Sequence, residues 1–407
     1  MTRKAIFISI DGMTDQLGQS QVLPYLAGLS ASGFSVEIVS AEKKLNFEKN
    51  FEQVNAITKA ANITWNYNFY ESSIPVVSQR KNFKRLKKLT EERILANNKN
   101  VFLHCRSYLP GLIGLFFKRK LNIPFIFDMR GFWADERIDG NIWSLKNPIH
   151  KRLYSFFKKK EKEMLLAADE VVTLTINAKK EIVSWPLPKQ PNIHVIPCCA
   201  DVQHFVIQEK QKIVELKERL GIPYANFVVG YLGSLGTWYM QNEMLDFFKE
   251  VLKIKPDATF FFVTNDKKED VIAAANVRGI ASEHLVIKAA SRKEVPLFIS
   301  TFDVGLFFIK PLYSKKGSSP TKLAELMACG VPVIANAGVG DVDKIINSGS
   351  AGIVIEEFTS DQYKKAINAI EPYLQKDKYL YRQVAEEQFS LSKGIQSYSK
   401  IYSTFQK

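Results

Sequence analysis

The chain has 407 residues, of which 46% are hydrophobic and 24% are charged, and it carries a formal net charge of +14 at pH 7. This composition is ordinary for soluble globular proteins and excludes fibrous and intrinsically disordered chains. The length exceeds what one hydrophobic core usually supports, so we expect two domains, or three.

Strands and helices alternate along the first half of the chain. Short apolar runs predict strands at Lys4–Ile10, Ser35–Ser40, Ile63–Tyr67, Val101–His104, Pro124–Phe127, Glu170–Thr175 and Ile193–Ile196. Amphipathic segments predict helices at Ser20–Ala31, Phe47–Ala60 and Pro110–Lys120, and two basic helices that end near Leu95 and Ala167. Such alternation is typical of a parallel, doubly wound sheet.

The second half repeats this plan. Its strands are expected near Val228–Leu232, Thr259–Val263, Leu285–Ile287, Val304–Phe308, Val331–Ala335 and Gly352–Val354. Two such sheets in tandem predict two α/β domains of similar size. We place the first at residues 1–197 and the second at residues 198–388, followed by a last helix within residues 389–407.

The basic residues are concentrated in the first half. Residues 1–200 contain 30 Lys and Arg against 18 Asp and Glu, whereas residues 201–407 contain 26 against 24. Much of the surplus lies in Arg80–Arg93, Lys118–Lys120 and Lys146–Lys162. Basic amphipathic helices bind anionic membranes, and each basic residue near the surface contributes about 1 kcal/mol. A solvated helix face explains the pattern equally well, and no motif indicates binding of nucleic acid.

The cysteines and the N-terminal sequence favour the cytoplasm. The four cysteines lie in apolar or strand-end settings and two are adjacent, which suits neither a disulfide framework nor a metal site. The first four residues lead directly into a short apolar run, so we expect no signal peptide. No uncharged run reaches the ~18 residues of a membrane span. We expect a cytoplasmic protein, peripheral on the inner face of the membrane if the basic helices bind it.

Ligands of doubly wound sheets bind beyond the carboxyl ends of the strands, so the loops that follow strands contain the candidate residues. Gly12 and Gly18 follow the first strand but lack the G-x-G-x-x-G spacing of a dinucleotide site. Arg106 follows the fourth strand, and Asp128 and Arg130 begin a polar, aromatic run after the fifth. Arginines of this kind bind phosphate through paired hydrogen bonds, although a surface salt-bridge cluster is the alternative.

The segment Gly317–Asn336 carries the most specific pattern in the chain. A Gly/Ser loop leads into a helix, for which Ser319 suits the N-cap and Pro320 the first helical position. Gly330 suits the C-cap, and a buried strand follows it. The segment therefore predicts a short helix whose N-terminus directly follows a Gly/Ser loop.

The first turn of this helix is suited to bind an anion. Free N–H groups, the helix dipole and Lys322 all favour a phosphate there. Glu325 shares a face with Thr321 and Lys322, so a ribose attached to that phosphate would lie within its reach. An ordinary helix cap with a solvated Lys–Glu pair is the alternative.

The segment closely resembles the nucleotide-sugar motif of GT-B glycosyltransferases of family 4. In that family two glutamates eight positions apart precede a hydrophobic-Ala-x-Gly-x-Pro-Val run, and the second glutamate holds the ribose hydroxyls. Glu325 matches the second glutamate, whereas the first falls on Gly317. The Ser-Ser-Pro-Thr-Lys sequence resembles a variant found in bacterial surface-polysaccharide transferases, which adds Ser318, Ser319 and Thr321 to the expected donor site.

Other loops extend the resemblance over essentially the whole chain. The loop at Gly233 and Ser234 is similar to a Gly-Arg-Leu loop of the family, whose arginine and a lysine six residues later contact the diphosphate. Here Ser234 and Met240 occupy those two positions, so both cations are absent. The nearest basic residues that could replace them are Lys310, Lys315 and Lys322.

The resemblance also assigns the first-half loops and the fold. Gly12 and Gly18 would face the donor phosphates, and Asp128 stands where many members carry a histidine near the donor sugar. Pro197–Asp201 is similar to the interdomain segment of the family, and the last helix is expected to return to the first domain. The resemblance therefore implies the GT-B architecture of two tandem Rossmann-like domains.

These features together predict a retaining, metal-independent hexosyltransferase. It would move a sugar from a nucleotide-diphosphate donor to a lipid-linked or other glycan in the synthesis of bacterial lipopolysaccharide, capsule or exopolysaccharide. The five histidines are scattered and no Asp-x-Asp occurs, so we expect no metal or other cofactor. A GT-B-fold nucleotide-sugar epimerase and a non-catalytic sugar-nucleotide-binding subunit are the alternatives, and the basic first half favours the transferase.

The expected site residues fall into two groups. We expect catalytic roles for Asp128, Arg130 and Lys322. We expect the donor to be bound by Gly12, Gly18, Arg106, Gly233, Ser234, Lys310, Ser318, Ser319, Thr321, Lys322 and Glu325.

Overall fold

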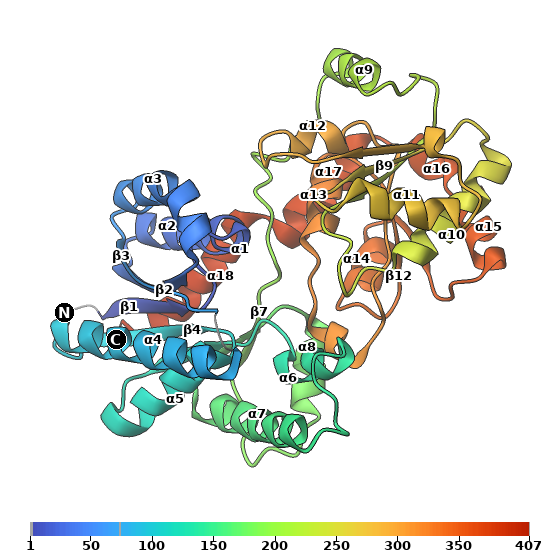
Figure 1. Ribbon diagram of the computed structural model, residues 1–407. Helices are drawn as coiled ribbons and strands as arrows, with labels where there is room; N and C mark the ends of the chain where they lie inside the picture. The colour runs from blue at the N-terminus through green and yellow to red at the C-terminus, as the bar shows by residue number, and fades with distance from the viewer. Residues whose placement is uncertain (1–2, 73–74, 407) are drawn as a thin grey trace. The chain divides into compact units, whose positions relative to one another are not determined.

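The computed structural model describes residues 3–72 and 75–406 and divides the chain into two compact units (Figure 1). Unit 1 comprises Met1–Pro197 and Leu391–Lys407, and unit 2 comprises Cys198–Ser390. The sequence places the last boundary after residue 388, whereas the structure has it after Ser390. The difference arises because Ala200 pairs with Ser390 and its N–H donates to the carbonyl of Phe389 at 2.9 Å, which keeps both residues in unit 2.

Unit 1 is built on a parallel sheet. Within its described residues the sheet has seven strands in the order β3-β2-β1-β4-β5-β6-β7. The strands are β1 (Lys4–Ser9), β2 (Val36–Glu42), β3 (Thr64–Phe69), β4 (Val101–Arg106), β5 (Phe125–Asp128), β6 (Glu170–Thr173) and β7 (Ile193–Val195). β1, β4 and β5 are almost entirely buried, as strands covered by helices on both faces must be.

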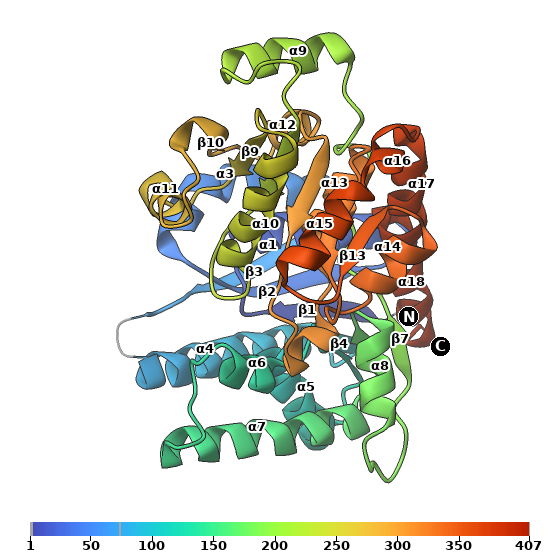
Figure 2. The same cartoon turned by 90° about the vertical axis from the view of Figure 1, so that its right-hand side faces the viewer.

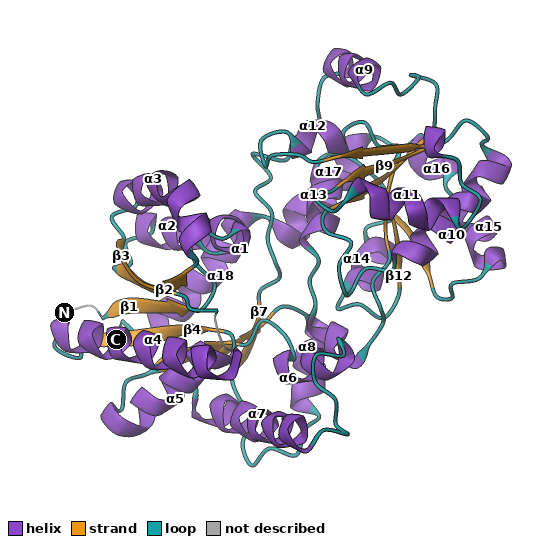
Figure 3. Ribbon diagram, in the orientation of Figure 1, coloured by secondary structure: helices purple, strands orange, loops and turns teal. Residues whose placement is uncertain are grey.

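The helices of unit 1 cover both faces of this sheet (Figures 2 and 3). They are α1 (Gln16–Gln21), α2 (Leu23–Ala31), α3 (Lys44–Ala60), α4 (Pro75–Ala96), α5 (Tyr108–Leu121), α6 (Trp133–Asp139), α7 (Pro148–Ala167), α8 (Ile176–Val183) and α18 (Leu391–Thr404). The helix predicted at Ser20–Ala31 is two helices, because the backbone breaks at Val22 (φ −126°, ψ −63°) ahead of Pro24, which has no N–H to continue a helical ladder. The short helices α6 and α8 are not among the sequence-based predictions.

The last helix, α18, packs against α2 within unit 1. A Cβ at position 28 would lie 2.2 Å from Cδ1 of Ile395, so Gly28 is what allows the two helices to approach. The Tyr398 ring meets the Tyr25 ring edge-on at 5.6 Å, and the Tyr402 hydroxyl lies 2.9 Å from Nδ1 of the buried His104. The expected return of the C-terminal helix to the first domain is therefore confirmed.

The two basic helices of unit 1 differ in how they bury their apolar residues. In α4, Leu86 is buried and Phe83 and Leu89 pack against the hydrophobic core. In α7, Phe157 is buried, whereas Ile149 and Phe156 are 68% and 46% exposed. The apolar side of α4 is thus unavailable to a membrane, and only its exposed charges remain. No helix in residues 3–72 or 75–406 has both the length and the apolar character of a membrane span.

Unit 2 repeats the architecture of unit 1. All of its residues are described, and its six-stranded parallel sheet has the order β10-β9-β8-β11-β12-β13. The strands are β8 (Val228–Leu232), β9 (Thr259–Val263), β10 (Leu285–Lys288), β11 (Val304–Phe307), β12 (Val333–Asn336) and β13 (Gly352–Ile355). The helices are α9 (Lys210–Arg219), α10 (Gln241–Ile254), α11 (Lys268–Asn276), η1 (Ser282–His284), α12 (Val295–Ile299), η2 (Tyr313–Gly317), α13 (Thr321–Ala328), α14 (Val342–Ser348), α15 (Ser360–Asn368), α16 (Glu371–Leu374) and α17 (Lys378–Phe389).

Both sheets reverse their strand order at one place. In unit 1 the reversal lies between β1 and β4, and in unit 2 it lies between β8 and β11. The carboxyl ends of strands at such a switch point form the usual ligand crevice of doubly wound folds. The predicted pair of Rossmann-like sheets is confirmed, and it directs attention to the loops after β1, β4, β8 and β11.

We expect Tyr398→Phe to destabilise the attachment of α18 to unit 1. The Tyr398 hydroxyl donates at 3.1 Å to the buried carboxylate of Asp128, and removal of a donor to a buried charged group costs about 1–3 kcal/mol. Ser397→Ala is the matched control, because the Ser397 hydroxyl bonds only to the carbonyl of Lys393 in its own helix. Amide hydrogen exchange in α18 measures the effect. Equal protection in the two variants would contradict the proposed importance of the hydrogen bond.

Candidate functional site

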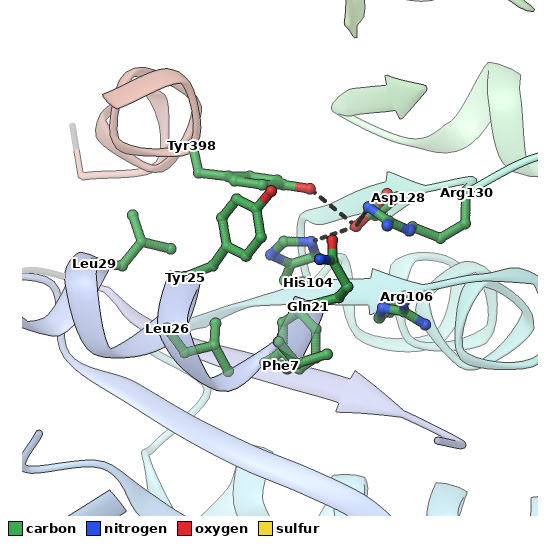
Figure 4. A pocket seen from close by; sticks show the side chains of 11 residues that line it. Phe7, Gln21, Tyr25, Leu26, Leu29, His104, Arg106, Asp128, Arg130 and Tyr398 are labelled. Carbon is green, nitrogen blue, oxygen red and sulfur yellow. Dashed lines mark hydrogen bonds and ion pairs between the residues drawn. The ribbon is translucent and has the colours of Figure 1, made fainter. Parts of the chain in front are cut away.

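At the carboxyl end of β5, the Asp128 side chain is buried inside unit 1 (Figure 4). Its Oδ2 accepts the hydroxyl proton of Tyr398 at 3.1 Å and lies 3.4 Å from Nε2 of His104. Nη1 of Arg130 lies 3.9 Å from the same oxygen. Tyr398 comes from the last helix of the chain, so Asp128 joins three segments that are far apart in sequence.

The charge of Asp128 is balanced by its neighbours. Burial acts to raise the pKa of this carboxyl, but Arg130, His104 and Arg106 together hold the pKa below its ordinary value. The side chain is therefore an anion at neutral pH. Its second oxygen, Oδ1, is buried and has no hydrogen-bond partner among the described residues. Arg106 in turn forms an ion pair with Asp11 at 2.5 Å, across the switch point between β1 and β4.

The backbone is strained at the ends of these two strands. Ser107 follows β4 with φ 71°, and Arg130 follows β5 with φ 61°, a region that residues other than glycine seldom adopt. The Ser107 N–H donates to the carbonyl of Asp128 at 2.7 Å, which fixes the two turns to each other. Strain of about 1–3 kcal/mol per residue persists only where the surroundings impose it, and it gathers at functional sites.

The pocket beneath Arg130 is too small for a sugar. It is lined by Asp128, His104, Arg106 and Tyr398 among others, and its volume of about 10 Å³ suits roughly one water molecule. Asp128 lies inside this pocket with 2% of its surface exposed. Asp128 therefore contacts His104 and Arg130 inside the unit, and the side chains of Arg106 and Arg130 are themselves only 7% and 14% exposed.

The glycine-containing loop after β1 is held by a buried glutamate. Glu42, at the end of β2, accepts hydrogen bonds from the backbone N–H groups of Met13 and Thr14 at 2.8 and 3.1 Å. A Cβ at Gly12 would lie 2.5 Å from the Glu42 carboxylate, and one at Gly18 would lie 2.1 Å from the carbonyl of Gly12. Both glycines are thus required by the packing of the loop itself. Glu42 cannot at the same time hold a ribose, as the acid at this position does in dinucleotide-binding sheets.

In unit 2, helix α13 begins one residue later than predicted. Helical geometry starts at Thr321, and Pro320 occupies the N-cap position with ψ 119° and no side-chain cap. The hydroxyl of Ser319 is not the cap, because it accepts a hydrogen bond from the N–H of Cys198 at 3.1 Å. The first N–H groups of α13 therefore have no side-chain acceptor and can bind a ligand.

The C-terminus of α13 has the predicted glycine. Gly330 has φ 76°, its N–H donates to the carbonyl of Met327, and the N–H of Val331 donates to the carbonyl of Leu326. This pair of hydrogen bonds is a Schellman motif, which ends the helix sharply and starts the turn into β12. The motif fixes the length of α13 and hence the place of its N-terminus.

Lys322 is buried beneath the loop that follows β8. Its Nζ donates to the Tyr231 hydroxyl at 3.0 Å and lies 3.4 Å from the centre of the Tyr239 ring. A Cβ at Gly233 would be 3.4 Å from the same nitrogen, so the Lys322 side chain ends directly beside this glycine. Burial lowers the pKa of Lys322 well below its usual value, while Glu325 and Asp266 act in the opposite direction.

Glu325 lies one turn further along α13 and is partly buried. Burial raises the pKa of its carboxyl to about 7, against the opposing effects of Arg292 and Lys322. Within the described chain no group donates a hydrogen bond to this carboxylate. A polar, half-ionised acceptor without a partner, beside a helix N-terminus, is suited to bind a pair of hydroxyl groups.

The other predicted donor residues of unit 2 differ in their burial and in their contacts. Lys315 is buried with its Nζ 3.6 Å from the centre of the Trp238 ring, whereas Lys310 is exposed to solvent. The Ser234 hydroxyl accepts from the N–H of Gly236 at 3.2 Å and so stabilises its own turn. Ser318 and Thr321 are partly buried at the start of α13. Of the three candidate lysines, Lys322 alone reaches the Gly233 turn and the start of α13 together.

Several residues of this arrangement are absent from the sequence-based predictions. Tyr231 and Tyr239 enclose the Lys322 ammonium, and Arg292 is the strongest cation acting on Glu325. The signal for the tyrosines is their position, since both flank the loop after the first strand of unit 2. Arg292 has no such signal, because it lies on a turn between β10 and α12. In the described part of the chain, no group of three His, Cys, Asp or Glu side chains suits a metal ion, and the need for a metal stays untested.

Two family models match the chain. Residues 19–204 match the model described as Glycosyltransferase Family 4, and residues 212–384 match the model described as Glycosyl transferases group 1. Together these segments take in most of both units. A curated relative, the N-acetyl-alpha-D-glucosaminyl L-malate synthase of Bacillus anthracis, is 26% identical over 200 residues. The match covers 47% of this chain and 49% of the relative, so the chain spans about half the length of that protein.

Solved structures resemble the chain over nearly its full length. A glycosyltransferase from Rickettsia africae has a TM-score of 0.72 at 15% identity, with 100% of this chain and 99% of that chain covered. The Anabaena protein HepE in complex with UDP and glucose has a TM-score of 0.69 at 13% identity, with 99% and 100% covered. At such low identity this likeness shows the fold alone, and the fold is the one that the family models require. The chain belongs to the GT-B glycosyltransferases of family 4.

Proposed function

We propose that the protein is a retaining glycosyltransferase that moves a sugar from a nucleotide-diphosphate sugar to a lipid-linked or other glycan. The pathway we propose is the synthesis of a bacterial surface polysaccharide. One observation carries the proposal: Lys322 and Glu325 lie one turn apart at the start of α13, next to the Gly233 turn and at the switch point of unit 2. These groups match the parts of a nucleotide diphosphate in order, first phosphate and then ribose.

The donor is bound by unit 2 in this proposal. The N-terminal amides of α13 and the Lys322 ammonium bind the diphosphate, and the Glu325 carboxylate accepts hydrogen bonds from the two ribose hydroxyls. HepE, which shares the fold, was solved in complex with UDP and glucose, and this supports a nucleotide-sugar donor. The curated relative is named as the synthase of a glucosaminyl compound, which supports transfer of a hexose-type sugar.

The chemistry depends on charge that develops on the leaving diphosphate. Burial disfavours the charged form of Lys322 and lowers its pKa well below the usual value. An anion within reach acts in the opposite direction, so the ammonium is stabilised as the diphosphate binds, and most strongly as the bond to the sugar breaks. The diphosphate itself accepts the proton of the acceptor hydroxyl, and a metal ion is not needed in this proposal because cationic side chains provide the compensating charge.

The acceptor belongs to unit 1 in this proposal. We assign Arg130 and Arg106 to the acceptor side, because they lie at the carboxyl ends of β5 and β4 beside the buried Asp128. Unit 1 has 33 Lys and Arg against 18 Asp and Glu, whereas unit 2 has 23 against 24. A basic unit next to an acceptor that is linked to an anionic lipid would concentrate the enzyme where its substrate is.

The first experiment measures the product. We expect incubation with a labelled nucleotide sugar and a lipid-linked glycan to give a labelled glycan with the anomeric configuration of the donor. Lys322→Ala should lower turnover at saturating donor by about 10²-fold, as for loss of one group that stabilises a leaving anion. Lys344→Ala is the control, because Lys344 is an exposed lysine of α14.

The same experiment separates the alternatives. Isomerised donor without transfer would indicate an epimerase, and neither product would indicate a binding subunit. Equal turnover of the Lys322 and Lys344 variants would show that Lys322 takes no part in the reaction.

Glu325 generates a prediction about pH. If only the ionised carboxylate binds the ribose, affinity for the nucleoside of the donor should rise about tenfold from pH 6 to pH 8, because the pKa of about 7 lies between them. A nucleoside is the right probe, since it has no phosphate that titrates in this range. Glu325→Gln should remove the pH dependence and weaken binding by about 1.5–3 kcal/mol, which calorimetry measures. A flat profile for the wild-type protein would contradict the assignment.

Membrane binding through α4 should be electrostatic. Because the apolar side of α4 faces the core, we expect binding to anionic vesicles at low salt and complete release at high salt. Replacement of four basic residues of α4 by Gln should weaken flotation at least tenfold without changing nucleotide affinity: Lys84, Arg85, Lys87 and Lys88. The control makes the same change in charge at exposed lysines of unit 2: Lys267, Lys268, Lys344 and Lys364. Equal loss in both sets, or no binding at low salt, would contradict the proposal.

A further inference from the structure

Unit 2 contains a cavity at the amino-terminal ends of its central strands, whereas the candidate donor site lies at their carboxyl ends. The cavity has a volume of about 590 Å³, which is within the usual range for small-molecule sites. Phe227 and Asp303 line it, and these residues directly precede β8 and β11. Gly233 follows the carboxyl end of β8. Because a strand rises about 3.3 Å per residue, the cavity and the Gly233 turn lie roughly 15–20 Å apart. Helix α9, which is drawn above α12 in Figures 1 and 2, forms part of the wall of the cavity.

The cavity is strongly basic, and we name it the lysine cavity after four of its lining residues: Lys210, Lys217, Lys255 and Lys378. Asp303 is the only carboxylate in its lining. No carboxylate of the described chain lies within ion-pair distance of any of the four lysines. Unit 2 as a whole carries slightly more acidic than basic residues, so this cluster does not follow from a general excess of lysine.

Lys217 is the most informative of the four lysines. Only 6% of its surface is exposed, yet its ammonium makes a single long hydrogen bond, at 3.4 Å, to the carbonyl of Tyr224. An ammonium can donate three hydrogen bonds, and a buried charged group that lacks partners is costly. The side chain is therefore built to receive at least one further acceptor from within the cavity.

Asp303 lies among these lysines without neutralising them. Its carboxylate accepts a hydrogen bond from the N–H of Val228 at 2.7 Å, which holds it at the start of β8. Burial raises its pKa, while Lys217, Lys378 and Lys255 act to lower it. Three lysines from different segments thus stabilise the charge of one carboxylate, Asp303. Their positive charges exceed its single negative charge.

The other walls of the cavity suit the body of a ligand rather than its charge. Tyr224 is 56% exposed, with the ammonium groups of Lys210 and Lys217 at 5.9 and 5.6 Å from its ring centre. Phe227 has the Lys255 ammonium 4.9 Å from its ring centre. Aromatic faces beside cationic groups are typical of sites that bind a ring carrying a phosphate.

We propose that the lysine cavity is a second ligand site, which binds a phosphorylated small molecule whose phosphate is held by Lys217 and its neighbouring lysines. Sugar phosphates and nucleotides both fit this chemistry, as does free phosphate with lower affinity. The proposal rests on the geometry of unit 2 alone and does not depend on the transferase reaction.

The test uses the full-length protein at fixed ionic strength, titrated by calorimetry with three probes: inorganic phosphate, a hexose phosphate and a nucleoside monophosphate. We expect binding of at least one probe, and we expect the ring-bearing probes to bind at least tenfold more tightly than phosphate. The double variant Lys210→Gln and Lys255→Gln should weaken that binding at least tenfold. The matched control replaces Lys249 and Lys268 by Gln, since both are exposed lysines of unit 2 outside the cavity.

One further variant, Lys322→Ala, separates this site from the donor site. Binding at the lysine cavity should be unchanged in Lys322→Ala, whereas binding at the donor site should be weakened by it. The relative affinities of the three probes then identify whether a sugar, a nucleoside or the phosphate alone is recognised.

Three results would overturn the proposal. Absence of binding by all three probes at millimolar concentration would show that the cavity is only solvated. Equal effects of the cavity variant and its control would show that the lysines attract anions without a site. Loss of binding only in Lys322→Ala would assign the phosphate to the donor site. None of these results bears on the proposed donor role of Lys322, because that role is tested by the turnover of Lys322→Ala at saturating donor.

Discussion

The arrangement of unit 1 depends on one buried carboxylate. Asp128 lies at the end of β5 with its charge maintained by Arg130, His104 and Arg106, and its Oδ2 accepts a hydrogen bond from the Tyr398 hydroxyl of the last helix. A buried charge is tolerable only with such partners, so the sheet, the two strained turns after β4 and β5, and the C-terminal helix have to be assembled together. The last segment of the chain therefore contributes directly to the first unit's candidate surface.

Unit 2 presents the opposite electrostatic situation. Lys322 is buried like Asp128, but its ammonium lies against two tyrosine rings. The carboxyl that acts on it, Glu325, has a pKa raised to about 7. Burial disfavours the charged form of both groups, so it lowers the pKa of Lys322 and raises that of Glu325. A nucleotide diphosphate would stabilise both charges at once, the ammonium by its phosphates and the carboxylate by its ribose hydroxyls. Asp128 thus has cationic partners without a ligand, whereas the Glu325 carboxylate accepts no hydrogen bond within the described chain.

The sequence predicts the parallel sheets and the end of α13 well, because those depend on local patterns. Buried strands appear as short apolar runs, and Gly330 marks a turn that only a glycine adopts easily. The predictions fail where a side chain bonds to a distant segment. Ser319 has the sequence of an N-cap, but its hydroxyl bonds to Cys198, 121 positions away. Nor does the sequence predict that the hydroxyl of Tyr398, 270 positions away, donates to the Asp128 carboxylate.

The two anion sites proposed for unit 2 lie at opposite ends of the same strands, and this limits how they can influence each other. Two unit charges roughly 15 Å apart interact by about 1 kcal/mol at an effective dielectric constant near 20, and salt reduces this further. Direct repulsion between a donor at α13 and a phosphate in the lysine cavity is therefore small. A larger coupling would require β8 or β11 to move, and both are fully buried strands at the centre of the sheet. The physical expectation is that the two sites bind nearly independently, so that a ligand of the lysine cavity would act mainly on the stability of unit 2 and on helix α9, which forms its wall.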